Sequence, residues 1–72
     1  MDKVQIVIDA HRYLAYIAID SNDLLLAKGH TDSAYLHFQN DRVYLNKLAA
    51  QILFANLLYE RARLAYLFAG SG

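Results

Sequence analysis

The sequence contains no cysteine, no proline and no tryptophan. The lack of cysteine excludes disulfides, thiol catalysis and thiolate metal sites. Glutamate is nearly as scarce, because Glu60 is the only one, and a carboxylate-bridged di-metal centre in a helical bundle needs several. The longest uninterrupted apolar run, from Tyr13 to Ile19, is far shorter than the roughly 20 residues of a membrane-spanning helix. The composition therefore predicts a chain that does not cross a membrane.

The charges balance, with seven basic and seven acidic residues among 72. No overall field therefore attracts nucleic acid or an anionic membrane surface. The start of the chain lacks the basic and apolar segments of a signal peptide, so we expect a cytoplasmic or recombinant soluble protein. Hydrophobic residues make up 57% of the chain, more than is usual. Because so short a chain buries little surface alone, this excess predicts an interface with a second copy.

Polar pairs recur every seven positions between residues 32 and 69, which predicts one long continuous helix. The pairs are Asp32/Ser33, Gln39/Asn40, Asn46/Lys47 and Glu60/Arg61, and apolar Leu53/Phe54 and Leu67/Phe68 fall on the same two heptad positions. Three other heptad positions are apolar. The first holds Phe38, Leu45, Ile52, Tyr59 and Tyr66, and the second holds Leu36, Val43, Ala50, Leu57 and Leu64. The third holds Ala34, Leu48, Ala55, Ala62 and Ala69 and is interrupted only by Asp41. Apolar side chains on several sides indicate more than one packing partner.

The preceding segment predicts a first helix over about residues 2–28. At 100° per residue its polar side chains gather in one narrow arc, and aliphatic side chains fill the rest of the wheel. Lys28 and Gly29 are typical of a last helical turn followed by a left-handed cap. Thr31 or Asp32 then begins the next helix. Since only a few residues separate the two helices, we expect them to fold back antiparallel.

The sequence thus predicts an all-α protein with a single domain over residues 1–72. An antiparallel hairpin of helices 2–28 and 32–69 would assemble into a four-helix bundle. The second helix is the longer, so residues beyond about Tyr59 would pack on another chain. The residues predicted to form the core and the self-association surface are Val4, Val7, Ile8, Leu14, Ile17, Leu25, Leu36, Phe38, Val43, Leu45, Leu48, Ile52, Leu57, Tyr59, Leu64 and Tyr66.

The first 40 residues also allow a β-rich alternative. Val4, Ile6 and Ile8 alternate with polar residues in the manner of a strand. The alternative fold is a four-stranded β-meander followed by one long helix. We favour the helical interpretation because the turns of such a meander lack glycine at their tips, and because the meander would leave the polar arc of residues 2–23 a coincidence.

His11 is the most interesting candidate ligand. It points into the apolar arc of the first helix beside Ala15 and Ala18, where small side chains leave space for a flat cofactor such as haem with an axial imidazole. The simpler interpretation is a histidine at the edge of the core, with the alanines there for close helix packing, because no second ligand accompanies it at metal spacing. We therefore predict no cofactor and no metal, with haem at His11 as the alternative.

The sequence offers no arrangement for catalysis. Its serines have no base at a recognisable spacing, and it contains neither a glycine-rich phosphate loop nor paired acids. Six tyrosines and three phenylalanines come with too few lysines and arginines for a nucleic-acid surface. We predict a protein without enzymatic activity that binds neither nucleic acid nor membrane.

Two long capped helices joined by the tight connection Gly29-His30-Thr31 resemble the helical-hairpin dimers of the Rop type and, more generally, designed two-helix bundle units. The resemblance covers the whole chain but is architectural, without a matched motif. It implies a structural homodimer, and the lack of proline, cysteine and tryptophan, with the terminal Gly70-Ser71-Gly72, implies a protein designed de novo. The basic residues that bind RNA in natural hairpin dimers have no counterpart cluster on the first helix. A small partner-binding hairpin, such as an antitoxin or adaptor, is a further alternative.

Overall fold

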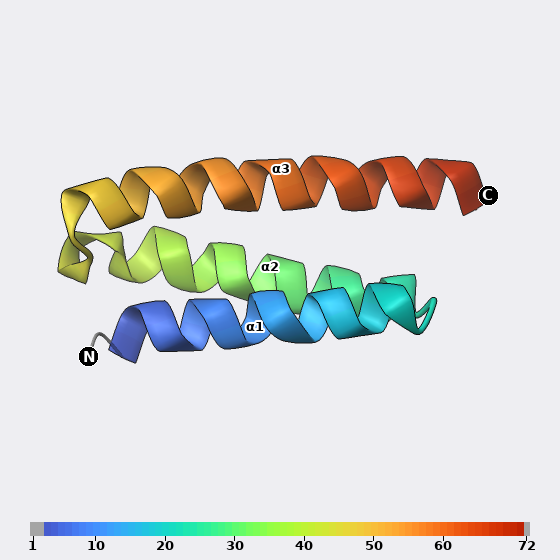
Figure 1. The fold of residues 1–72 in the computed structure, drawn as a ribbon, viewed down its shortest axis with the longest axis horizontal. Coiled ribbons are helices and arrows are strands. Elements are labelled where there is room, and N and C mark those ends of the chain that lie inside the picture. Colours follow the sequence, from blue (N-terminus) through green and yellow to red (C-terminus); the bar gives the residue numbers. More distant parts are fainter. Residues whose placement is uncertain (1–2, 72) are drawn as a thin grey trace.

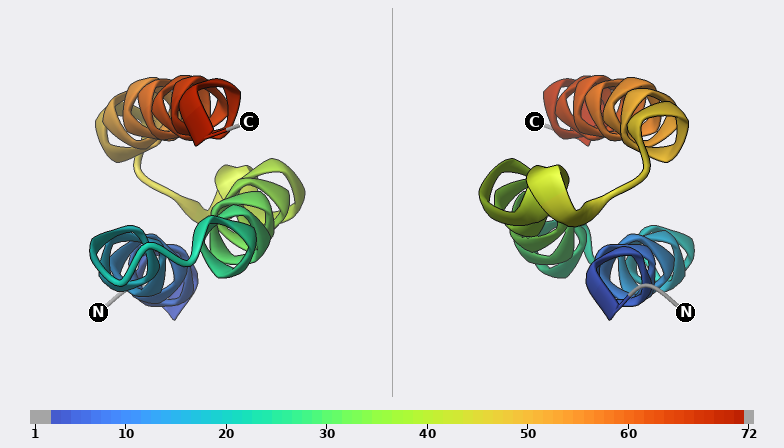
Figure 2. Two further views of the ribbon diagram at one scale, coloured as in Figure 1. Left: turned by 90° about the vertical axis from the view of Figure 1, so that its right-hand side faces the viewer. Right: turned by 90° about the vertical axis from the view of Figure 1, so that its left-hand side faces the viewer.

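A computed structural model describes residues 3–71, and in this range the chain forms three α-helices. Helix α1 spans Lys3–Asp20, α2 spans Leu24–Asp41 and α3 spans Lys47–Ser71, with a short 3-10 helix η1 at Arg42–Tyr44. The helices run alternately in opposite directions along a molecule of 38 × 17 × 16 Å (Figure 1). Seen end on, they occupy the corners of a triangle (Figure 2).

The predicted all-α class is confirmed, and the β-meander is wrong for the described range, because residues 3–71 contain no strand. The two-helix hairpin is also wrong, since the chain reverses twice instead of once. Within the same range no helix is long and apolar enough to cross a membrane. Residue 2, where the first helix was predicted to begin, and Gly72 lie outside the described residues.

The first reversal lies between α1 and α2. Asn22 has a φ of 60°, a left-handed conformation that asparagine tolerates better than most residues. Asp23 then caps α2, because its Oδ1 accepts a hydrogen bond from the Leu26 amide at 3.1 Å. Such a cap satisfies an amide at the helix start that has no partner within the helix.

The reversal predicted at Gly29 does not occur. Gly29 lies inside α2 and has no positive φ, so it is not a left-handed cap. Lys28 pairs with Asp32 one turn further on, with Nζ 2.7 Å from Oδ2. These residues therefore support the middle of a helix, because the start signal lies earlier, at Asp23.

The second reversal interrupts the helix predicted over residues 32–69. Leu45 is extended, with φ −93° and ψ 150°. Asn46 then caps α3, because its Oδ1 accepts hydrogen bonds from the amides of Leu48 at 2.9 Å and Ala49 at 3.4 Å. The predicted continuous helix is wrong because Asn46 begins a new helix.

Two apolar clusters hold the three helices together. The larger cluster contains Ile8, Ala34, Phe38, Leu45, Leu53 and Leu57. The smaller contains Ala18, Ala27 and Leu64, one residue from each helix. The prediction that Leu64 packs on another chain is therefore wrong, because the end of α1 and the start of α2 cover it.

The second reversal also changes which heptad position faces the core. The first predicted position is buried at Phe38 and Leu45 but exposed at Ile52, Tyr59 and Tyr66. The second position shows the opposite order, with Leu36 and Val43 exposed and Leu57 and Leu64 buried. The break after α2 shifts the phase of the heptad repeat. The first heptad position therefore faces the core in α2 but faces outward in α3.

Candidate functional site

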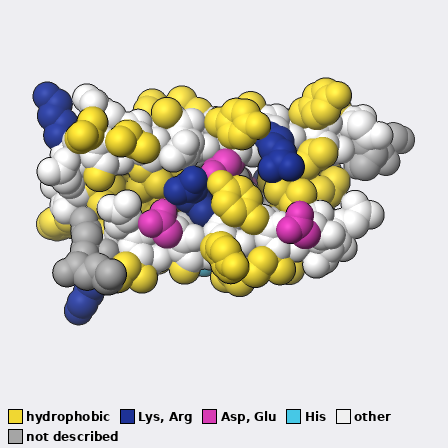
Figure 3. Space-filling view, in the orientation of Figure 1, with side chains coloured by type: hydrophobic (Ala, Val, Ile, Leu, Met, Phe, Trp, Pro, Cys, Tyr) yellow, Lys and Arg dark blue, Asp and Glu magenta, His cyan; other side chains and the backbone are white. Residues whose placement is uncertain are grey.

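A polar network joins α1 to α3. Figure 3 shows basic and acidic side chains meeting between the two helices. The Arg12 guanidinium donates from Nε to Glu60 Oε1 at 2.9 Å and from Nη2 to Oε2 at 2.7 Å. Arg12 Nη1 also lies 3.2 Å from Asp9, and the Tyr16 hydroxyl donates to Glu60. Arg12 and Glu60 therefore form a bidentate, charge-assisted ion pair, which is stronger than a neutral hydrogen bond.

This network shows that the polar arc of α1 is partly covered by α3. The side chain of Arg12 is 18% exposed and that of Glu60 is 11% exposed, because α3 covers this side of α1. The hydrogen bond to Glu60 raises the pKa of Arg12. Burial, and next the hydrogen bond to Glu60, raises the pKa of Tyr16. At ordinary pH Arg12 is charged and Tyr16 is neutral even without these shifts, and the network acts as a structural tie.

All three histidines of the sequence gather between α1 and α2. The Nδ1 atoms of His11 and His30 lie 3.0 Å apart, so one ring donates a proton and the other accepts it. His37 stacks on His11 with ring centroids 5.5 Å apart. Burial, and next the charges of His30 and His37, lowers the pKa of His11. The sequence pattern did not bring these residues together, because it placed His30 in a loop.

The histidine cluster is not arranged as a metal site. Within residues 3–71 no group of three or more histidine, cysteine, aspartate or glutamate side chains could hold a metal ion. The rings of His11 and His37 are within 17° of parallel, so their in-plane lone pairs do not converge on one point. Ala15 and Ala18 are buried, and Ala18 packs with other residues of the chain. The absence of a cofactor stays a prediction, and haem at His11 stays its alternative.

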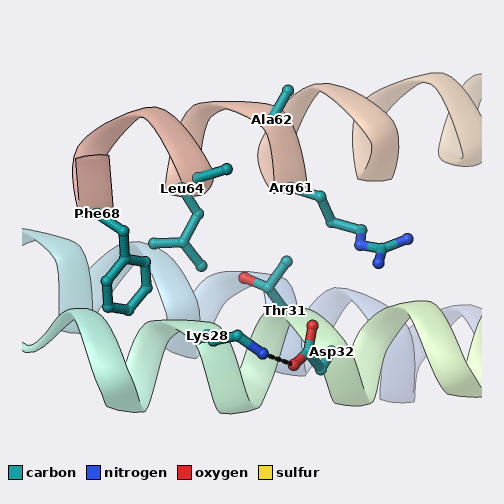
Figure 4. A pocket seen from close by; sticks show the side chains of 8 residues that line it. Lys28, Thr31, Asp32, Arg61, Ala62, Leu64 and Phe68 are labelled. Atoms are coloured by element: carbon teal, nitrogen blue, oxygen red, sulfur yellow. Dashed lines mark hydrogen bonds and ion pairs between the residues drawn. The ribbon is translucent and has the colours of Figure 1, made fainter. Parts of the chain in front are cut away.

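A groove of about 360 Å³ lies between α2 and α3. Figure 4 shows Lys28 directed at Asp32 along one side, with Leu64 and Phe68 on the other. The guanidinium of Arg61, at the rim, lies 4.1 Å from the centre of the Tyr35 ring. The charged groups at the rim thus already contact other groups of the chain.

Apolar side chains cover the faces of α3 and α1 that turn away from the bundle. On α3 they follow one another at intervals of four and three residues. We call this set the α3 stripe: Leu48, Ile52, Ala55, Tyr59, Ala62 and Tyr66. The α1 stripe has the same intervals and consists of Ile6, Ala10, Tyr13 and Ile17. Figure 3 shows hydrophobic side chains along both edges of the molecule, over α3 and over α1.

The large side chains of the α3 stripe are mostly uncovered. Leu48 is 63% exposed, Ile52 55%, Tyr59 67% and Tyr66 77%. Single exposed apolar residues are normal on protein surfaces, but a contiguous apolar patch marks an interaction site. The intervals of four and three keep the stripe on one side of the helix, as in a coiled-coil seam. The α3 stripe is therefore the best candidate site of the described residues.

The structure divides the predicted core and self-association residues into two groups. The buried group is Ile8, Phe38, Leu45, Leu57 and Leu64, with Val4 half-buried. The exposed group is Val7, Leu14, Ile17, Leu25, Leu36, Val43, Leu48, Ile52, Tyr59 and Tyr66. Ile6 and Tyr13 were missing from the prediction, although their heptad spacing with Ala10 and Ile17 was visible in the sequence. The role of the exposed group in self-association stays a prediction.

No protein-family model matches the sequence, and no curated protein or solved structure with which it was compared is significantly similar to it.

Proposed function

We propose that this chain is a structural protein that associates with itself through the α3 stripe, and that the homodimer is its basic unit. The observation that carries the proposal is an uncovered, heptad-spaced apolar stripe along most of α3. Covering apolar surface contributes about 25 cal/mol per Å². Removal of this stripe from water therefore favours an arrangement in which a second copy covers it.

The size of the stripe suits a small dimer interface. Tyr59 and Tyr66 are 67% and 77% exposed. Together they supply roughly 300 Å² of exposed surface per chain, since an aromatic side chain can bury about 150–250 Å². Stable interfaces begin near about 600 Å² per partner. Leu48, Ile52 and the neighbouring exposed Leu58 add apolar area toward this threshold.

The polar clusters support an assembly role over a catalytic one. Each cluster contacts other groups of the same chain: Arg12 binds Glu60, Lys28 binds Asp32, and His11 contacts His30. Lys28 and Asp32 line the groove between α2 and α3, but their charged groups bind each other there. The uncovered surface is apolar, and a partner that covers it must be apolar too.

A dimer of this chain differs from the assembly expected of a two-helix hairpin. Each chain contributes three helices from its described residues, so two chains contribute six. The seam between subunits would lie on α3, and each subunit keeps its own core around Phe38 and Leu57.

The proposal is tested by placing a charge on the stripe. Ile52→Glu should raise the dimer dissociation constant about 100-fold or more, because an interfacial charge without a partner costs several kcal/mol. The matched control is Leu25→Glu, on α2 outside both stripes, where the side chain is 77% exposed. Sedimentation equilibrium gives the subunit number, and circular dichroism verifies that both variants stay helical. Equal dimerisation of the two variants would refute the role of the α3 stripe.

A further inference from the structure

We infer that two copies pair their α3 helices antiparallel, around a two-fold axis that passes beside residue 57. This inference rests on the proposed self-association through the α3 stripe and adds its orientation and register. A two-fold interface places the same surface on both subunits, so each contact occurs twice. An axis at residue 57 brings together residues whose numbers add up to 114, which is twice 57.

This register opposes large side chains to small ones. Ile52 faces the partner's Ala62, and Tyr59 faces the partner's Ala55. At the ends of the stripe, Leu48 faces the partner's Tyr66, where a long ring can lie over the rim of the pair. Each inner layer therefore contains one large and one small side chain, the alternation that lets two facing surfaces interdigitate without voids.

A parallel pair, in which each residue faces the same residue of the partner, would pack badly. Tyr59 would meet the partner's Tyr59, whereas Ala55 would meet the partner's Ala55 and Ala62 the partner's Ala62. Layers with two rings would force the helices apart, and the neighbouring layers with two methyl groups would then contain voids. Overpacking and cavities both destabilise. The order of residue sizes along the stripe thus favours the antiparallel arrangement.

The flanks of the stripe are compatible with this register. Asn56 and Leu58 lie on opposite sides of the stripe, and the two-fold axis brings each of them close to the same residue of the partner. Two amides can pair, because each has donors and an acceptor, and two leucines bury apolar surface together. Arg63 is level with the partner's Gln51, so no like charges oppose each other. Glu60 is turned inward and bound to Arg12.

The length of the stripe distinguishes it from the other exposed helix face. It extends over 18 residue steps, from residue 48 to residue 66, or about 27 Å at 1.5 Å per residue. The α1 stripe extends over 11 steps, about 16 Å. The α3 stripe therefore offers the longer continuous seam for a second copy.

An exchange of residue sizes tests the layer between Ile52 and the partner's Ala62. Ala62→Ile places two large side chains in this layer and should raise the dimer dissociation constant about tenfold, the effect of a moderate overpacking cost. Adding Ile52→Ala restores one large and one small residue, so the double variant should return to within about threefold of the original, a difference of under 1 kcal/mol. A double variant that dimerises no better than Ala62→Ile would overturn the register.

Cysteine cross-linking tests the orientation directly, because the chain has no cysteine of its own. One preparation carries Ile52→Cys and another carries Ala62→Cys, and the two are mixed under mild oxidation. In the antiparallel pair, residue 52 meets the partner's residue 62, whereas identical positions are ten residues and about 15 Å apart along the axis. A disulfide requires Cα atoms within about 7 Å. We expect cross-linked heterodimers, identified by intact mass, and no cross-linked homodimers.

The other outcomes separate the orientation from the proposed function. Cross-linked homodimers from each preparation alone would overturn the antiparallel arrangement while leaving self-association in place. Dimers by sedimentation that form no cross-link would overturn the register at residue 57 but not the homodimer. An unaltered chain that stays a monomer would overturn both proposals.

Discussion

Arg12 and Glu60 form the only ion pair between different helices among the described residues, since the other two pairs lie within α1 and within α2. Their side chains are largely covered, so each charge depends on the other for its hydrogen bonds. Loss of one partner leaves the other charge poorly solvated, which is more costly than loss of an exposed pair.

We expect Arg12→Ala and Glu60→Ala each to lower the free energy of unfolding by about 2 kcal/mol. Urea denaturation measures this difference. Lys28→Ala is the control, because its pair with Asp32 is half exposed, and it should cost at most about 0.5 kcal/mol. A loss for Arg12→Ala no greater than that for Lys28→Ala would show that the α1–α3 tie contributes little.

The histidine cluster makes stability depend on pH. Burial, together with the charges of His30 and His37, holds the pKa of His11 below the ordinary value of 6.5. The unfolded chain therefore binds more protons at this site than the folded chain once the pH falls below about 6.5. The contribution of His11 to the stability of the folded state is fully present above that pH. It is lost as the pH falls through the lower pKa that His11 has in the folded chain.

Thermal melts between pH 8 and pH 5 measure this effect, and His11→Gln is the variant that isolates it. The unaltered protein should lose stability on acidification below about 6.5, and His11→Gln should lose less. Equal losses in the two proteins would mean that His11 titrates as it does in the unfolded chain.

The helix boundaries show which sequence signals prevail at the level of elements. The period of the apolar residues was sufficient to predict helices, yet it continued across both reversals and concealed them. The reversals depend on two capping side chains, Asp23 and Asn46, each of which accepts a hydrogen bond from an amide two or three residues later. Both were visible in the sequence, but Gly29 is the stronger general stop signal and favoured the wrong boundary.

The exposed stripe was predictable only in part. The sequence identified Leu48, Ile52, Tyr59 and Tyr66 as apolar heptad residues, but it could not separate core from surface. That separation depends on the phase shift at residues 42–46, which a seven-residue repeat does not encode. The polar network was missed because the pairing of Arg12 with Glu60 spans 48 positions and exists only once a third helix lies beside α1.

Gly29 distinguishes the three-helix fold from a two-helix hairpin. Inside α2, a Cβ added at Gly29 meets nothing within 4 Å, so Gly29→Ala should raise the free energy of unfolding by about 0.5–1 kcal/mol. At a left-handed cap the same change would introduce strain and lower it by about 1 kcal/mol. Gly70→Ala, near the end of α3, is the control and should have a smaller effect, because helix ends fray. Chemical denaturation shows whether Gly29→Ala raises or lowers the free energy of unfolding.

At the scale of the whole molecule, polar and apolar side chains are distributed unusually. The polar side of α1 faces α3 through Arg12, whereas the outward faces of α1 and α3 are apolar. Hydrophobic residues form 57% of the sequence, and a bundle only 17 × 16 Å across has too small an interior to cover them all. The proposed association of copies would remove the α3 stripe from water without changing the fold.

Sedimentation equilibrium of the unaltered protein is the most direct test of self-association, because it reports mass without labels or substitutions. One chain has a mass of 8.2 kDa, so we expect a species of twice that mass, 16.4 kDa, whose fraction rises with concentration. A mass of 8.2 kDa at every concentration up to the millimolar range would contradict self-association and leave the α3 stripe without its proposed partner.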